Sequence, residues 1–152
     1  MKLKERNGIV RVLKMLPERL KNEISSLAYA RSGGIGGIRE IALRSVGRSY
    51  VTFADGVIPL FTAVGSDEIE KIVFELCDGA LYAFRDTIRE GYIPFSDGVR
   101  VGVAGVARYE EGEVVGITGF GSLLFRIPTG ECAFREDIVS ICDGGIGRGM
   151  LI

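Results

Sequence analysis

The glycine-rich segment DGGIGRGMLI, near the end of the chain, is the first place where the sequence could do chemistry. Gly144 and Gly149 have the opening spacing of a phosphate-binding P-loop, in which backbone N–H groups surround the phosphates and a lysine reaches the terminal one. Met150 and Leu151 stand where that loop needs Lys and then Ser or Thr. The segment therefore predicts a turn before an apolar strand, and it is not a P-loop.

Three further groups of residues could bind an anion or a metal, and each has a simpler interpretation. The glycines of residues 32–38 follow a predicted helix, whereas phosphates are bound where a helix begins. The acidic pairs Glu110-Glu111 and Glu136-Asp137 lie beside turn and helix-start signals, where carboxylates are favoured locally. The chain has no histidine, which excludes Ser-His-Asp catalysis and mixed Cys/His zinc sites. We predict no catalytic residue and no metal ligand.

Two arginines within predicted strands are the strongest candidates for a binding role. Arg100 and Arg126 are each flanked on both sides by apolar residues. Alternation along a strand puts each guanidinium on the face opposite those neighbours. Such a planar, permanently charged donor suits a phosphate or a carboxylate, although an ordinary solvated sheet face explains the same pattern. Arg108 and Arg148 lie near turns and are weaker candidates.

The composition describes one globular domain that is rich in glycine. The chain has 152 residues, of which 22 are glycine and 47% are hydrophobic, and its net charge of −1 lacks the basic character of a dedicated nucleic-acid binder. Three cysteines without C-x-x-C spacing predict free thiols in a reducing compartment. The longest uncharged stretch, residues 114–125, is too short to span a membrane, and no signal peptide opens the chain. We therefore expect a soluble, cytoplasmic protein.

Residues 1–34 are predicted to form a pair of helices. Apolar residues repeat at the helical spacing i, i+3, i+4, i+7 on both sides of Pro17. The two stripes are Ile9, Val12, Leu13 and Leu16, and then Leu20, Ile24, Leu27 and Ala28. Pro17 suits the first position of the second helix, and Gly33-Gly34 suits its end.

After residue 34 the pattern changes to strands that alternate with short helices. Period-two runs joined by acidic-glycine turns predict strands over residues 39–46, 50–53, 57–60, 92–95, 99–109, 113–118 and 122–128, with Pro59 keeping its strand at a sheet edge. Helices are predicted from Ser66 as N-cap to Gly79, from Leu81 to Gly91, and over residues 135–142. The fold class is therefore α+β, an antiparallel sheet of hairpins with helices packed on it, preceded by the N-terminal helical pair.

An ordered series of short motifs runs through nearly the whole chain. It comprises Pro17-Glu18-Arg19-Leu20, Ile41, Leu43, Arg44, Gly47-Arg48, Tyr82-Ala83-Phe84, Gly91-Tyr92-Ile93, Arg100-Val101-Gly102, Gly105, Ala107, Gly112, Ile117, Ser122-Leu123 and Arg126-Ile127. In this order the motifs resemble the N-terminal region of the stage III sporulation protein AA family, secretion-type ATPases of spore-forming bacteria. The family usually has proline where this chain has Ser49. The string FRIP, residues 125–128, is instead similar to pilus-retraction and type II or IV secretion ATPases.

The resemblance implies that the sequence is one part of a larger ATPase. In the family, the strand that corresponds to residues 150–152 leads into a Walker A loop, which the sequence given does not reach. The implied organisation is a helical segment over residues 1–34, a PAS-like α+β domain over residues 35–143, and the start of a connection to a RecA-like ATPase domain over residues 144–152. A Walker A motif is expected within about ten residues of Ile152.

The resemblance also implies a mechanism and a set of partners. The family forms homo-hexameric rings powered by ATP with Mg²⁺, in which the N-terminal domain moves against the ATPase domains. Arg126, two residues before Pro128, and next Arg100 would sense the γ-phosphate of the nucleotide, while the fragment alone holds no cofactor and hydrolyses no ATP. The expected partners are its own ATPase domain, neighbouring subunits and a membrane protein of the sporulation channel. The expected location is the inner face of the mother-cell membrane.

Two other classes of function remain open, both for a stand-alone α+β domain. Basic and aromatic residues are mixed at Tyr82, Phe84, Arg85, Arg89, Tyr92 and Arg100, as a stacking platform for single-stranded nucleic acid requires. Phe84 lies on an apolar helical stripe, so core packing explains it better, and nucleic acid is not an expected partner. A small-ligand site is disfavoured because the sequence has no Trp, no His and no convergent polar set.

Overall fold

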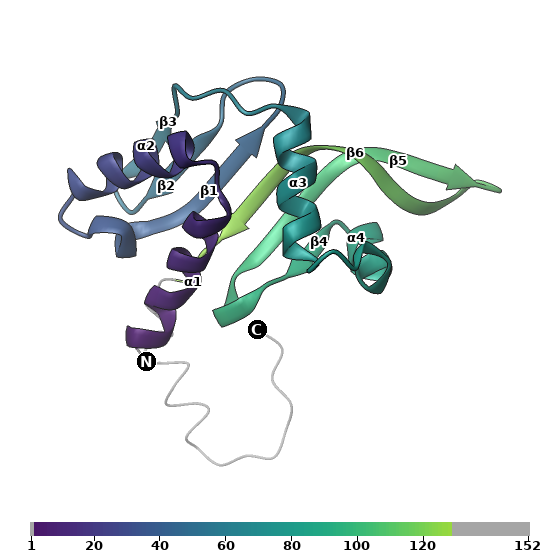
Figure 1. The fold of residues 1–152 in the computed structure, drawn as a ribbon, viewed down its shortest axis with the longest axis horizontal. Coiled ribbons are helices and arrows are strands. Elements are labelled where there is room, and N and C mark those ends of the chain that lie inside the picture. Colours follow the sequence, from purple (N-terminus) through teal and green to yellow (C-terminus); the bar gives the residue numbers. More distant parts are fainter. Residues whose placement is uncertain (1, 129–152) are drawn as a thin grey trace, which may run out of the picture.

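The computed structural model describes residues 2–128 of the chain (Figure 1). Its helices are α1 (Lys2–Met15), α2 (Glu18–Tyr29), α3 (Ser66–Leu76) and α4 (Arg85–Arg89), with short 3-10 helices η1 (Gly34–Gly37), η2 (Leu81–Phe84) and η3 (Ser96–Gly98). Its strands are β1 (Ile38–Arg44), β2 (Tyr50–Phe53), β3 (Gly56–Pro59), β4 (Tyr92–Pro94), β5 (Arg100–Glu110) and β6 (Glu113–Arg126). The predicted helix over residues 135–142 and the connection over residues 144–152 lie outside the described residues.

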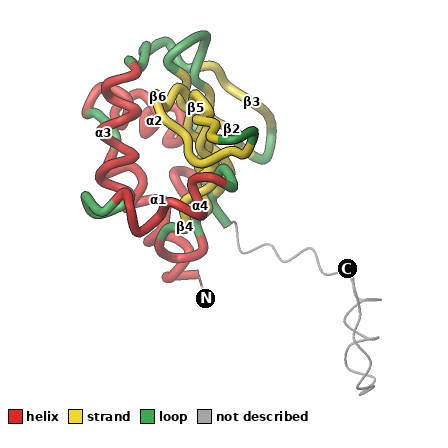
Figure 2. The backbone as a smooth tube through the Cα atoms, turned by 90° about the vertical axis from the view of Figure 1, so that its right-hand side faces the viewer, coloured by secondary structure: helices red, strands yellow, loops and turns green. Residues whose placement is uncertain are grey.

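The strands form one six-stranded sheet in the order β3-β2-β1-β6-β5-β4, with every neighbouring pair antiparallel. Figure 2 shows the helices gathered on one side of this sheet. We call the side under the helices the covered face and the other side the open face. The α+β class, the hairpins and the N-terminal helical pair are confirmed. Pro59 lies in β3, an edge strand as predicted, where its missing N–H breaks no interior ladder.

The core lies between the covered face and the helices. Both predicted stripes of the helical pair point into it, with Ile9, Val12, Leu20, Ile24 and Ala28 at most 1% exposed. Helix α2 ends at Tyr29, earlier than the predicted stop at Gly33-Gly34. The chain turns there because backbone N–H groups past the helix bond back to its last turns, and the glycines form η1 instead.

Two further helix boundaries differ from the prediction. Ser66 is the first residue of α3 and not its N-cap, a position that Gly65 occupies, because Glu68 caps the helix by accepting the N–H of Gly65 at 2.9 Å. The helix predicted from Leu81 to Gly91 divides into η2 and the five-residue α4. Only Ile88 of this segment is fully buried, since α4 is too short to present a long apolar stripe.

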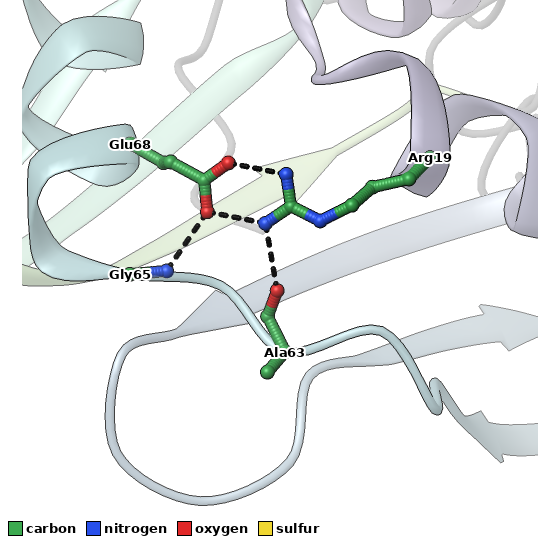
Figure 3. Close-up of polar contacts among 4 residues, drawn as sticks. All are labelled: Arg19, Ala63, Gly65 and Glu68. Atoms are coloured by element: carbon green, nitrogen blue, oxygen red, sulfur yellow. Dashed lines mark hydrogen bonds and ion pairs between the residues drawn. The ribbon is translucent and has the colours of Figure 1, made fainter.

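The helix layer is joined by a contact between α2 and α3 (Figure 3). The Arg19 guanidinium donates to both oxygens of Glu68, at 2.5 and 2.6 Å, and also to the backbone oxygen of Ala63 at 3.0 Å. The hydrogen bond from Arg19, and next the one from the Gly65 N–H, lower the pKa of Glu68. Residues 49 positions apart in sequence are thereby fixed to each other.

Strands β5 and β6 are longer than the rest of the sheet. The two strands predicted over residues 113–118 and 122–128 are the single strand β6, which continues past an irregular register opposite Gly105. A Cβ at Gly105 would lie 2.7 Å from the Thr118 carbonyl oxygen, so only glycine allows the two backbones to approach here. No helix among residues 2–128 is long and apolar enough to cross a membrane.

Cys77 occupies the end of α3 and is fully buried. Burial, and to a smaller extent the charge of Asp78, raise the pKa of its thiol. This environment agrees with the interpretation of Cys77 as a small core hydrophobe, because the reactive thiolate form is disfavoured. Cys132 and Cys142 lie outside the described residues.

Candidate functional site

The open face brings the two predicted arginines together. Arg100 and Arg126 are direct partners across β5 and β6, and Glu40 is the partner of Arg126 on β1. Partnered residues of neighbouring strands share a face, so the three side chains form one charged row. Their strands present them because the flanking apolar residues turn to the covered face, where Val99, Val101, Phe125 and Ile127 are all buried.

Neither arginine is locked in place by a strong contact. The Arg126 Nε lies 3.7 Å from Glu40 Oε2, beyond hydrogen-bond distance, and the Arg126 side chain is 70% exposed. The Arg100 guanidinium lies over the ring of Tyr92, 5.3 Å from its centre. An exposed ion pair of this kind contributes little to stability, so both guanidiniums are available to an outside anion.

A second row beside the charged one is aromatic at its two ends and mostly small in the middle. Its members, in the order of the strands, are Tyr50, Ala42, Leu124, Gly102 and Tyr92. The two tyrosines are half-buried, and each has an arginine over its ring, since Arg44 lies over Tyr50 at 5.3 Å as Arg100 lies over Tyr92. The open face therefore combines planar cations with rings on a rigid sheet.

Sequence reasoning did not select Glu40, Arg44 or Tyr50 as site residues. The alternation in β1 did place Glu40 and Arg44 on the face opposite Ile41 and Leu43. The pattern does not show that β1 pairs with β6. This pairing places Glu40 beside Arg126, although their segments lie more than 75 residues apart in the sequence. A register is a property of two strands together, and one strand's periodicity does not contain it.

The weaker arginine candidates do not join the open-face pair. Arg108 lies toward the far end of β5 and pairs with Glu110 at 3.2 Å, with both side chains well exposed. Eight residues of extended strand, or about 26 Å, separate it from Arg100. Arg148 lies outside the described residues, as does the glycine segment that contains it.

The remaining candidates from the sequence show no assembled site. Glu110 and Glu111 lie at the exposed turn between β5 and β6, and Glu136-Asp137 lie outside the described residues. The glycines of residues 34–37 form η1 between a helix and a strand, as predicted, and begin no α-helix. Within residues 2–128 no group of three or more His, Cys, Asp or Glu side chains could hold a metal ion.

The chemistry of the open face thus comes from three arginines, one glutamate and two tyrosines. Its net charge is positive although the whole chain carries −1. The arrangement suits an anionic group, and a planar ring could stack beside that group. Comparison with known proteins adds nothing to this geometry, because no family model, curated protein or solved structure matches the chain.

Proposed function

We propose that this chain is the N-terminal regulatory and oligomerisation domain of a hexameric sporulation ATPase of the secretion type, and that its open face senses nucleotide in the ATPase domain. The resemblance of the ordered motifs supports the family. The observation that carries the site is the cross-strand pair of Arg100 and Arg126. Like charges directly opposite each other destabilise a sheet, and a phosphate between them would remove that repulsion.

The position of Arg126 also supports a contact at a domain junction. Strand β6 ends at Arg126, so the chain leaves the sheet beside this guanidinium and continues toward residue 152. A domain that follows directly would lie near the same end of the open face. A guanidinium that faces a phosphate in a dry junction interacts much more strongly than one in water.

In this proposal the nucleotide and Mg²⁺ are bound by the ATPase domain, and arginines of the open face contact the γ-phosphate. Loss of that phosphate on hydrolysis would release the open face and let the two domains separate. The ring would act with a membrane protein of the sporulation channel, at the cytoplasmic face of the mother-cell membrane. The isolated chain would neither hydrolyse ATP nor bind it tightly.

The experiment that tests this proposal uses the longer protein that includes the ATPase domain. Arg126→Ala should lower the ATPase turnover at least about tenfold, as removal of a charge-assisted phosphate contact does. Arg126→Lys should recover only part of it, because lysine lacks the planar donor fork. Arg85→Ala, at an exposed position of α4, is the matched control and should retain wild-type turnover. Wild-type turnover in Arg126→Ala would reject the sensor role.

A second candidate function is the binding of single-stranded nucleic acid. It is favoured by one observation, that Tyr50 and Tyr92 lie half-exposed on an open sheet beside arginines. Sheets that bind single strands stack bases on such rings. Titration of the chain with single-stranded DNA at several salt concentrations separates the candidates, since a stacking platform predicts salt-sensitive binding and the ATPase proposal predicts none.

A further inference from the structure

The turn between β5 and β6 belongs to a projecting hairpin, which we call the arm and define as residues 104–119. Within it the two strands pair only with each other, because β4 pairs with β5 at residues 100–102 and β1 pairs with β6 at residues 122–126. Figure 1 shows the arm extending past the helices at one side of the molecule. No residue of the arm is buried.

The arm nevertheless carries apolar side chains. Val106 and Tyr109 are each 66% exposed, and Val114 and Val115 are only half-buried. Ile117, near the base, packs partly against the core. A two-stranded hairpin is at best marginally stable in water unless a further surface covers one of its faces. The described part of this chain supplies no surface that covers Val106 or Tyr109.

The charge of the arm indicates what that surface should carry. Glu110, Glu111 and Glu113 surround the tip, and Arg108, which pairs with Glu110, is the only basic residue of the arm. The net charge of the arm is therefore −2. A complementary surface would be basic and would offer aromatic or aliphatic side chains.

Such a surface exists on the same protein, at the end of β1 and the loop that follows. We call it the basic aromatic patch and define it by Arg44, Val46, Arg48, Tyr50 and Phe61. Val46 is 87% exposed and Phe61 88% exposed, values unusual for large apolar side chains. Each arginine lies over a ring, Arg44 over Tyr50 and Arg48 over Phe61 at 6.0 Å.

The backbone beneath the patch is held rigidly. The hydroxyl of Ser49, a buried residue, accepts the N–H of Arg44 at 3.0 Å, and its carbonyl accepts the N–H of Leu60. The carboxylate of Glu23 accepts the N–H groups of Phe61 and Thr62 at 2.6 and 3.0 Å. Ser49 and Glu23 thus hold the backbone around Phe61 in place, which is typical of an interaction surface formed in advance.

The arm cannot reach the patch of its own chain. The Ser45 N–H, beside the patch, donates to the Gly121 carbonyl at the base of the arm. Eight residues of extended strand separate Gly121 from Glu113, or about 26 Å. The tip would have to break the pairing of β5 with β6 to fold back. An arm that docks on the patch would therefore belong to another molecule.

We propose that the arm of one copy of this chain docks on the basic aromatic patch of a second copy. Glu110, Glu111 and Glu113 would face Arg44 and Arg48, while Val106, on the same face of β5 as Glu110, would cover Val46 and Phe61. The two surfaces are different, so the contact is head-to-tail, and repetition gives a ring or a filament and not a two-fold dimer. This inference rests on the oligomerisation role in the proposed function and names the two surfaces that would form the contact.

The test measures association of the 152-residue chain by sedimentation velocity from micromolar to millimolar concentration. Wild type should associate. A tip variant with Glu110→Lys, Glu111→Lys and Glu113→Lys, and a patch variant with Arg44→Glu and Arg48→Glu, should each associate at least about tenfold more weakly. An equal mixture of the two variants should associate again. The basic tip of the tip variant fits the acidic patch of the patch variant, and the acidic tip of the patch variant fits the basic patch of the tip variant.

A matched control reverses two basic residues elsewhere, Lys71→Glu and Arg85→Glu, which are exposed on α3 and α4. This variant should associate like wild type, and circular dichroism should show all variants folded. A wild-type chain that stays monomeric at millimolar concentration would overturn the proposal. So would a mixture that fails to associate, or a tip variant with wild-type association. None of these outcomes affects the test of Arg126→Ala, because that test measures ATPase turnover of the longer protein and this one measures association of the chain.

Discussion

The two sides of the sheet each carry an arginine–glutamate pair, and the pairs differ in construction. On the side of the helices, Arg19 and Glu68 form two short hydrogen bonds, and both partners also bond to backbone groups. On the open face, Arg126 and Glu40 approach only to 3.7 Å. The first pair is fixed in a network that ties two helices together, while the second leaves its guanidinium free to exchange partners. The same residue types therefore serve structure on one side and, in the proposed function, binding on the other.

The contrast extends to neighbouring residues of β6. Phe125 is completely buried on the covered face, whereas Leu124 and Arg126 point to the open face. One strand thus contributes to the core and to the candidate site in alternate residues.

Phe125→Ala should produce the largest effect. Removing a large buried side chain from a packed core costs about 3–5 kcal/mol of unfolding free energy. Urea unfolding of the isolated chain measures the loss. Leu124→Ala, one position away on the open face, should cost less than about 1 kcal/mol because its side chain is only partly covered. Equal losses in the two variants would contradict the assignment of the faces.

Glu68→Ala should lower the unfolding free energy by about 1 kcal/mol, since it removes both the partner of Arg19 and the acceptor for the Gly65 N–H. Thermal and urea unfolding report the change. Glu70→Ala, on the exposed side of the same helix, is the control and should remain within about 0.5 kcal/mol of wild type. A neutral Glu68→Ala would mean that the helices are held by apolar packing alone.

The contribution of Glu68 should also depend on pH. Its pKa in the folded state lies below the ordinary value of 4.5, so the stabilisation is fully present above that value. As the pH falls through the lowered pKa, protonation removes it. The stability difference between wild type and Glu68→Ala should therefore shrink in acid. The pKa of Glu23 is also lowered, because hydrogen bonds from Thr62 and Phe61 outweigh the effect of its partial burial. Glu23 is present in both proteins, so its titration does not change the stability difference between them.

Arg126→Ala should have the smallest effect on stability. The pair with Glu40 is exposed and loosely formed, so its loss should cost less than about 1 kcal/mol in the isolated chain. Thermal melts of that chain and turnover of the longer protein on the same substitution separate a sensor from a structural brace. A melting temperature well below wild type together with unchanged turnover would assign Arg126 to the structure. Arg100→Ala tests the other member of the pair in the same way.

The exposure of Arg100 and Arg126 on one face of the sheet could be predicted, because a charged residue between two apolar ones in a strand points to the face opposite them. Their adjacency could not, since it depends on which strands pair. Arg44 and Tyr50 belong to separate strands that only the tertiary pairing places beside this row. The end of α2 at Tyr29 and the N-cap of α3 at Gly65 were not predicted. Hydrogen bonds of the backbone and of the Glu68 side chain set these boundaries, and not the glycines and the serine on which the prediction was based.

Periodicity and turn residues within single segments predict the α+β class, the paired N-terminal helices, the hairpins and the burial of the apolar stripes. Only the tertiary structure shows that the helices of residues 2–128 cover one face, that β1 joins β6, and that β5 and β6 extend beyond their neighbouring strands as the arm. These features depend on the register and relative lengths of strands far apart in the chain. The open face and the basic aromatic patch exist only because those distant segments meet.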